Sequence, residues 1–196
     1  LVMEYANNGT LREFLKKSNL EWPEKIRLAS QITEGMSYLH SKNIIHRDLH
    51  TLNILIHNVN VKISDFGLSK NLNSITTTSS KEFCGVIPFI DPRKLEDPKY
   101  QYDQKSDVYS IGVLLWEISS NGRPPFSQSS NNNPLYLLSE ITRGVRETPT
   151  EGTPRRYIDL YSECWDYEPN NRPSMKQIFE QLNDLANLMK LINAFF

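Results

Sequence analysis

The amino-acid sequence predicts one mainly α-helical domain, a helical bundle that carries a single small β-hairpin. Three observations predict this fold class. Apolar residues recur at spacings of three or four positions over several long segments, which is the period of a helix. The segment 106–119 is apolar on nearly every face and indicates a helix at the centre of the core. Two short runs rich in β-branched residues lie close enough in sequence to pair as a hairpin.

The first two helices are predicted over residues 11–17 and 23–41. Thr10 and Glu13 fit a capping box, in which each side chain binds an otherwise unsatisfied backbone N–H of the first turn. Pro23 suits the first turn of the second helix, because proline lacks an N–H that this turn would leave unpaired. Apolar residues then recur every three or four positions, so the second helix is expected to pack on the core.

The hairpin is predicted from residues 54–56 and 61–63, with residues 57–60 as a four-residue loop. Residues 68–98 then predict a long loop. Ser, Thr and Asn are frequent in the first part of this segment, and Pro and Gly interrupt the rest. Loops of such length are usually functional or disordered.

Three more helices are predicted after the central one. They cover residues 134–142, 154–166 and 173–191, and each opens at or beside a proline. We find no internal repeat and no interdomain linker in the 196 residues. The sequence therefore predicts one domain.

Composition excludes several classes of protein. The chain has 22 basic and 23 acidic residues, a net charge of −1, so it lacks the basic surplus of a domain that binds nucleic acid through its phosphates. Cys84 and Cys164 lie far apart with no Cys-x-x-Cys spacing, which argues against a disulfide framework or a zinc site. The longest apolar stretch, residues 108–116, is far shorter than the roughly 20 residues that span a bilayer. We expect no membrane insertion and a cytoplasmic location, and the sequence leaves the oligomeric state open.

The first residues have no initiator methionine and no signal-peptide pattern, and they resemble a strand already in progress. We therefore expect that the true beginning of the protein lies upstream of Leu1.

Three polar residues are predicted to meet at the open end of the hairpin. Antiparallel pairing of the two strands would bring Asn53 and Asp65 close together, since they lie just outside the paired residues. Asp48 leads into the first strand through a loop of only four residues. Carboxylate and amide oxygens suit Mg²⁺, which takes the rest of its shell from water and substrate phosphates. By themselves, such residues could also be turn residues that cap strand ends.

The motifs around these residues resemble those of eukaryotic protein kinases. His46-Arg47-Asp48-Leu49-x-x-x-Asn53 is similar to the kinase catalytic loop, and Asp65-Phe66-Gly67 to the kinase metal-binding motif. The segment 107–117 resembles the buried kinase helix whose first aspartate braces the catalytic loop, and residues 164–165 and 172–174 resemble the closing segment. The likeness covers almost the whole chain and is greatest to the tyrosine-kinase-like group. It implies the α+β kinase fold, here a hinge (residues 1–10) and C-terminal lobe without the N-terminal lobe.

The resemblance implies a role for each of these positions. Asp48 would accept or orient the proton of the substrate hydroxyl, and Asn53 and Asp65 would hold Mg²⁺ against the phosphates of ATP. His46 is expected to be structural and not the base. The resemblance further implies a set of nucleotide-binding residues in the hinge and at the floor of the adenine pocket: Glu4, Ala6, Thr10 and Leu55.

A regulatory role is implied for Arg47, which resembles the arginine that clamps a phosphorylated activation segment in many kinases. The activation segment would span residues 65–93, between the catalytic loop at 46–53 and the helical remainder at 94–196. A phosphate there would add roughly two negative charges and could order the segment by pairing with the guanidinium. The candidate acceptors are Thr76, Thr77, Thr78, Ser79 and Ser80. The alternatives are a surface charge for Arg47 and a solvated loop for the acceptors.

The chain also departs from the kinase pattern. It contains no glycine-rich loop, no strand lysine for the phosphates and no helix glutamate to pair with that lysine, so the isolated 196 residues are expected to have little or no activity. The segment 85–93 resembles the substrate-docking stretch of kinases. Arg93 stands where that docking stretch usually has a glutamate that pairs with an arginine, here Arg172. Asp91 or Glu96 is expected to replace that glutamate, or the anchor is weakened.

The resulting expectation is an ATP- and Mg²⁺-dependent protein kinase in intracellular signalling. It would transfer phosphate to Ser/Thr hydroxyls of a protein substrate, with Tyr hydroxyls as the alternative. Val86 and His50 differ from common serine/threonine kinase residues and put that choice in doubt. A pseudokinase or scaffold that binds partners without turnover is the main competing interpretation, which the altered Arg93 and Val86 favour and the intact catalytic and metal-site residues oppose. A small-molecule phosphotransferase is a third, which Arg47 and the long segment after Asp65 disfavour.

Overall fold

The computed structural model describes residues 5–73, 86–128 and 133–194. Within these residues it contains seven α-helices, three short 3₁₀ helices and two two-stranded sheets, which confirms the predicted fold class. The elements are α1 (Leu11–Lys17), α2 (Trp22–Ser41), β1 (Ile44–Ile45), β2 (Ile54–His57), β3 (Asn60–Ile63), η1 (Phe66–Leu68), β4 (Lys70–Asn71), η2 (Ile87–Phe89), α3 (Pro92–Glu96), α4 (Gln104–Ser119), α5 (Pro134–Thr142), α6 (Arg155–Cys164), η3 (Pro169–Asn171) and α7 (Met175–Ala194).

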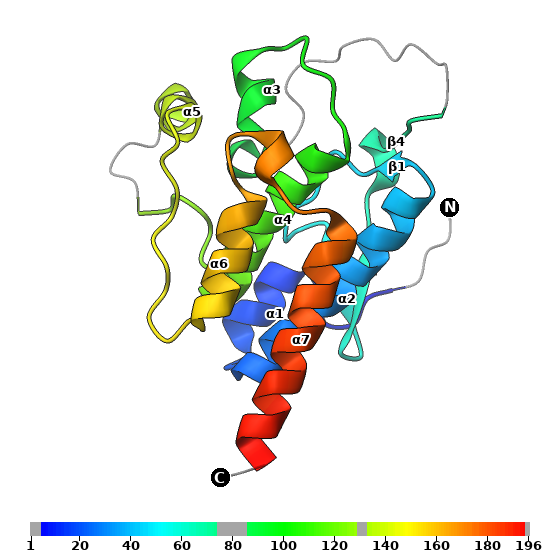
Figure 1. Ribbon diagram of the computed structural model, residues 1–196, viewed down its shortest axis with the longest axis vertical. Coiled ribbons are helices and arrows are strands. Elements are labelled where there is room, and N and C mark those ends of the chain that lie inside the picture. Colours follow the sequence, from blue (N-terminus) through cyan, green and yellow to red (C-terminus); the bar gives the residue numbers. More distant parts are fainter. Residues whose placement is uncertain (1–4, 74–85, 129–132, 195–196) are drawn as a thin grey trace.

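Helix α4 forms the centre of the core, as the sequence predicts. Every residue from 106 to 119 is buried, and α4 lies in the middle of the molecule in Figure 1. It begins two residues earlier than predicted, because Asp103 caps it and accepts hydrogen bonds from the N–H groups of Lys105 (2.8 Å) and Ser106 (3.1 Å). Helices α2 and α6 pack against α4, and α2 and α7 lie side by side.

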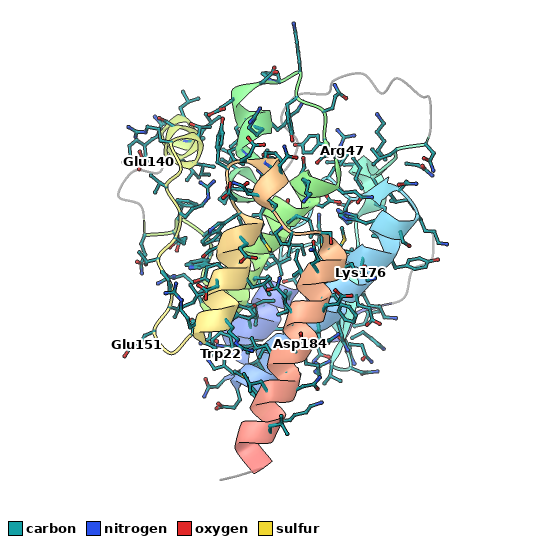
Figure 2. The ribbon with its side chains drawn as sticks, in the orientation of Figure 1. Trp22, Arg47, Glu140, Glu151, Lys176 and Asp184 are labelled. Carbon is teal, nitrogen blue, oxygen red and sulfur yellow. The ribbon has the colours of Figure 1, made fainter. Side chains whose placement is uncertain are left out.

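The remaining helices follow the predicted segments closely. The capping box at Thr10 and Glu13 is present at the start of α1, and α5 has the predicted bounds. Trp22, at the start of α2, lies at the opposite end of the molecule from Arg47 (Figure 2). No helix among the described residues is both long and apolar enough to cross a membrane.

The hairpin is present, but its predicted four-residue loop is wrong. Strands β2 and β3 pair antiparallel as far as His57 and Asn60, so the turn comprises Asn58 and Val59 alone. Both turn residues have positive φ, 53° and 85°, as a two-residue turn of this kind requires. This turn could not be predicted from the residue types, because valine rarely adopts positive φ.

The prediction of a loop over residues 68–98 is wrong in part. Strand β4 pairs antiparallel with β1, and η2 and α3 lie at the far end of the segment. Helix α3 forms because Pro92 occupies its first turn and the carboxylate of Asp91 accepts a hydrogen bond from the Arg93 N–H at 3.0 Å. Residues 74–85 lie outside the described part of the chain.

Candidate active site

The hairpin brings Asn53 and Asp65 to the same end of its two strands. Ile54 pairs with Ile63, and just beyond this pair the Ser64 N–H donates to the Asn53 carbonyl oxygen at 2.9 Å. Asn53 therefore lies opposite the residue that precedes Asp65. Asp65 itself adopts a left-handed conformation, φ 59°, and its carboxylate accepts a hydrogen bond from the Gly67 N–H at 3.2 Å. The predicted convergence of these two residues is present.

Asp48 joins the same group through the side chain of Asn53. The Asn53 amide nitrogen donates to the Asp48 backbone oxygen at 2.9 Å and to Asp48 Oδ2 at 3.1 Å. Interaction with the nearby His50 imidazole lowers the pKa of the Asp48 carboxyl, and the hydrogen bond from Asn53 adds to the lowering, although partial burial opposes the shift. The carboxylate is thus held ionised and in place next to the hairpin.

A buried aspartate on α4 supports the loop that carries Asp48. The Asp107 carboxylate accepts hydrogen bonds from the backbone N–H groups of His46 and Arg47, both at 2.9 Å. The imidazole of His40 lies 2.8 Å from the same carboxylate. Arg47 has a φ of 73°, a conformation that costs free energy for a non-glycine residue and persists where its surroundings fix it. The bracing role that the resemblance assigned to the first aspartate of this helix matches these contacts.

A second buried carboxylate connects the loop at residues 46–53 to α1. Glu117 on α4 is fully buried, accepts a hydrogen bond from the Thr51 hydroxyl at 2.9 Å, and pairs with the Arg12 guanidinium at 2.5 Å. This contact could not be predicted from the sequence, because no local pattern links residues so far apart in the chain. The loop from 46 to 53 is consequently anchored to the core at both of its ends.

His46 has a structural role in this arrangement. Its ring is fully buried, and Nε2 lies 3.0 Å from the Ser64 carbonyl oxygen while Nδ1 accepts a hydrogen bond from the Asp48 N–H at 3.4 Å. The ring also packs against Phe66 with centroids 5.1 Å apart. His46 thus connects the Asp48 loop to the segment that holds Asp65, which agrees with the expectation that it is not a base.

An open cleft with a volume of about 800 Å³ adjoins the two oxygen-bearing residues. It is lined by Ala6, Asn53, Leu55, His57, Lys62, Ile63, Ser64, Asp65, Phe66 and Gly67. The volume falls in the range of small-molecule sites, and a lining of apolar side chains with a few polar groups is typical of such sites.

The cleft contains some of the predicted nucleotide-binding residues. Ala6 and Leu55 line it. Thr10 is not among the lining residues, although its backbone forms a β-bridge with Leu55. The Thr10 hydroxyl accepts a hydrogen bond from the Glu13 N–H at 3.3 Å and so serves as the cap of α1. Glu4 lies outside the described residues.

The donor set at the cleft suits Mg²⁺. The Asn53 amide nitrogen is occupied by Asp48, while its oxygen accepts no hydrogen bond from any residue that the structure describes. Asp65 is exposed, and one of its oxygens receives the Gly67 N–H. Mg²⁺ typically binds a protein through the oxygens of a few side chains, and phosphates and water complete its coordination shell.

Arg47 and Lys94 place two positive groups close together, since both lie over the Tyr102 ring. The Arg47 guanidinium lies over the Tyr102 ring at 5.0 Å, and its buried Nε has no hydrogen-bond partner among the described residues. Burial and the nearby charge of Arg47 lower the pKa of Lys94. Figure 2 shows Arg47 at the end of the molecule that also carries α3 and the β1–β4 sheet. Thr76, Thr77, Thr78, Ser79 and Ser80 lie outside the described residues.

Asp91 takes the place of the glutamate that kinases usually have at the position of Arg93. Arg172 forms a fully buried ion pair with Asp91, with nitrogen–oxygen distances of 2.6 and 3.1 Å. Arg93 instead pairs with Glu168 at 3.2 Å in a partly exposed position. Of the two replacements that the sequence left open, Asp91 provides the buried anion, and Glu96 instead accepts a hydrogen bond from Tyr167.

Comparison with known proteins agrees with this geometry. A family model described as "Protein tyrosine and serine/threonine kinase" matches residues 1–182. A protein from Dictyostelium discoideum named as a probable serine/threonine-protein kinase is 38% identical over 95% of this chain and 18% of the relative. The megakaryocyte-associated tyrosine-protein kinase of Mus musculus is 35% identical over 93% of this chain and 35% of the relative. The chain spans less than half the length of these curated relatives.

Proposed function

Since the chain belongs to the protein tyrosine and serine/threonine kinase family, we propose that it is the catalytic part of an ATP- and Mg²⁺-dependent protein kinase. The observation that carries the proposal is the contact of Asn53 with Asp48 beside a cleft that Asn53 and Asp65 both line. In this proposal Asp48 is the catalytic residue, and Asn53 and Asp65 are the metal ligands.

The residues of the chain would position the reactants and balance their charge. When bound as its Mg²⁺ complex, ATP would supply an electrophilic γ-phosphoryl group that passes to a protein hydroxyl, with ADP as the leaving group. Asp48 orients that hydroxyl and accepts its proton, Asn53 fixes the Asp48 carboxylate through its amide nitrogen, and Asp65 offers its exposed carboxylate to the metal ion. Ala6 and Leu55 give the cleft an apolar surface for the adenine ring.

We propose Ser and Thr as the acceptors, with Tyr as the alternative. A relative at 38% identity is named as a serine/threonine-protein kinase, whereas one at 35% is named as a tyrosine-protein kinase. Phosphoamino-acid analysis of a substrate mixture labelled by the full-length protein separates the two. Label on serine and threonine supports the proposal, and label on tyrosine alone contradicts it.

The scaffold interpretation loses one of its two supports. It was favoured by Arg93, since a lost glutamate would weaken the anchor of the docking stretch. The anchor is retained, because Asp91 pairs with Arg172 inside the core. The remaining difference, Val86, is a residue of the docking stretch and does not touch the proposed metal ligands in any contact that the structure describes.

The direct test is transfer of labelled γ-phosphate by the full-length protein that carries this chain. Asp48→Asn keeps the shape of the side chain but removes the base, so turnover should be lost while nucleotide affinity is largely kept. Undiminished transfer by this variant contradicts the proposal. The matched control is Asp159→Asn, which alters an exposed carboxylate in an i,i+4 ion pair on α6 and should leave turnover unchanged.

We further propose the domain organisation that the sequence suggests, with a hinge at 1–10, a catalytic loop at 46–53 and an activation segment at 65–93. The 196 residues by themselves are expected to show little or no transfer, because they include no glycine-rich loop or strand lysine to hold the phosphates. Magnesium-dependent autophosphorylation by these residues alone contradicts this expectation. A cytoplasmic location stays a prediction.

A further inference from the structure

One oxygen of the proposed base is left without a hydrogen bond. Asp48 Oδ1 is buried and accepts none from the residues that the structure describes, whereas Oδ2 accepts one from Asn53. A buried carboxylate oxygen without a partner costs free energy, so such an atom calls for an explanation. The nearest charged or titratable partner that the structure records for Oδ1 is Nε2 of His50, at 3.5 Å.

The imidazole of His50 is set up to donate to this oxygen. The Leu52 N–H donates to Nδ1 at 3.3 Å, so Nδ1 carries no proton and Nε2 carries the ring N–H. The distance of 3.5 Å is longer than a normal hydrogen bond. Catalytic hydrogen bonds are often long in the absence of substrate and shorten when the reactants bind. Nε2–H of His50 can therefore donate to Asp48 Oδ1 once the two atoms move a few tenths of an ångström closer together.

His50 also contacts the stretch that the sequence assigns to substrate docking. Its ring centroid lies 6.0 Å from that of Phe89 in η2, with the planes tilted by 59°. Phe89 is held in turn by α4, because the Ser110 hydroxyl donates to its carbonyl oxygen at 2.7 Å. His50 and Phe89 are both buried, so neither ring can turn freely. Because the two rings are in contact and closely packed, a shift of η2 would also move the imidazole.

We propose that His50 is a positioning residue for phosphate transfer, whose Nε2–H orients the Asp48 carboxylate while its ring couples that carboxylate to Phe89 of the docking stretch. The inference rests on the proposed function and deepens it. Docking of a protein substrate against η2 would bring the imidazole toward Oδ1 and fix the base only when a substrate is present. His50 itself touches neither substrate nor metal in this role.

The test compares two substitutions in the full-length protein. His50→Gln retains a side-chain N–H near the position of Nε2, whereas His50→Met fills a similar volume without a donor. We expect kcat to fall by about 10- to 100-fold in the Met variant, since misplacement of a catalytic group by about 1 Å costs up to roughly 100-fold. The Gln variant should stay within about threefold of wild type, and KM for ATP should change little in both.

A double substitution tests the coupling to the docking stretch. Phe89→Leu should lower kcat as well, and combining it with His50→Met should give less than the product of the two losses, because both act through one carboxylate.

Equal losses of kcat in the Gln and Met variants would indicate that His50 acts through packing alone, and this result would overturn the positioning role. Multiplying losses in the double variant would overturn the coupling. If His50→Met fails to fold, His50→Asn replaces it, since its shorter amide cannot reach Oδ1.

The same assay separates this inference from the proposed function. If Asp48→Asn retains the wild-type rate, the proposed function fails as a whole. If Asp48→Asn abolishes transfer while folded His50→Met keeps the wild-type kcat, the positioning role alone fails. Loss of kcat in the Met variant with recovery in the Gln variant supports both.

Discussion

Removal of Asp91 is predicted to destabilise the helical core strongly. Asp91→Ala leaves the Arg172 guanidinium charged and unpaired at a site where both side chains are 0% exposed. Three backbone oxygens, those of Lys105, Asp166 and Tyr167, would still accept hydrogen bonds from it. They cannot replace the lost charge. Loss of one partner of a buried ion pair costs about 3–5 kcal/mol.

A smaller contribution adds to this cost. The Asp91 carboxylate also caps α3 through the Arg93 N–H, and loss of a cap costs about 0.5–2 kcal/mol. Because whole domains are stable by only about 5–15 kcal/mol, the variant should lose a large part of its stability. The pair lies beside the docking stretch, so activity should fall together with stability.

The measurement is equilibrium unfolding in urea, followed by tryptophan fluorescence. The chain has three tryptophans, and Trp165 closes α6 beside the turn that leads to Arg172. The matched control is Asp159→Ala, which breaks an exposed ion pair with Arg155 and should cost less than about 1 kcal/mol. If Asp91→Ala costs no more than Asp159→Ala, the reasoning about the buried pair is refuted.

Two further predictions concern packing and regulation. Gly112→Ala should cost about 1–3 kcal/mol in the same unfolding assay, because the added Cβ would lie 2.9 Å from atoms of Cys164 and Trp165. Gly35→Ala should be nearly neutral, since its Cβ would meet only the flexible end of one side chain, and equal losses would contradict this account. Alanine at residues 76–80 of the full-length protein should lower activity if a phosphate there orders the activation segment, and unchanged activity with no detectable phosphate rejects that role.

The helices could be predicted because the residues that determine each of them lie close together in the sequence. The capping box at Thr10 and the apolar faces of α2 and α4 depend on residues within one or two turns of each other. The pairing of β1 with β4 was not predictable, since each strand has two residues and the two lie far apart in the chain. The turn at Val59 was missed because its backbone conformation is unusual for a β-branched residue.

The candidate site was predictable to a similar degree. The hairpin register follows from its β-branched runs, and the register alone places Asn53 near Asp65. The pairing of Asp91 with Arg172 was left as one of two choices, because the sequence does not show which carboxylate enters the core. The contacts of Glu117 and His50 depend on how the loop folds back on α4 and η2, and they became visible only in three dimensions.

In the proposed site, Asn53 and Asp65 hold a divalent ion beside Asp48. A crystal structure of the full-length protein with a non-hydrolysable ATP analogue and Mn²⁺ tests it most directly, since anomalous scattering locates the metal. We predict an ion about 2.0–2.3 Å from an oxygen of each of the two side chains, with the phosphates between the ion and Asp48. A metal–nucleotide complex bound elsewhere, with neither side chain as a ligand, would rule out this metal site.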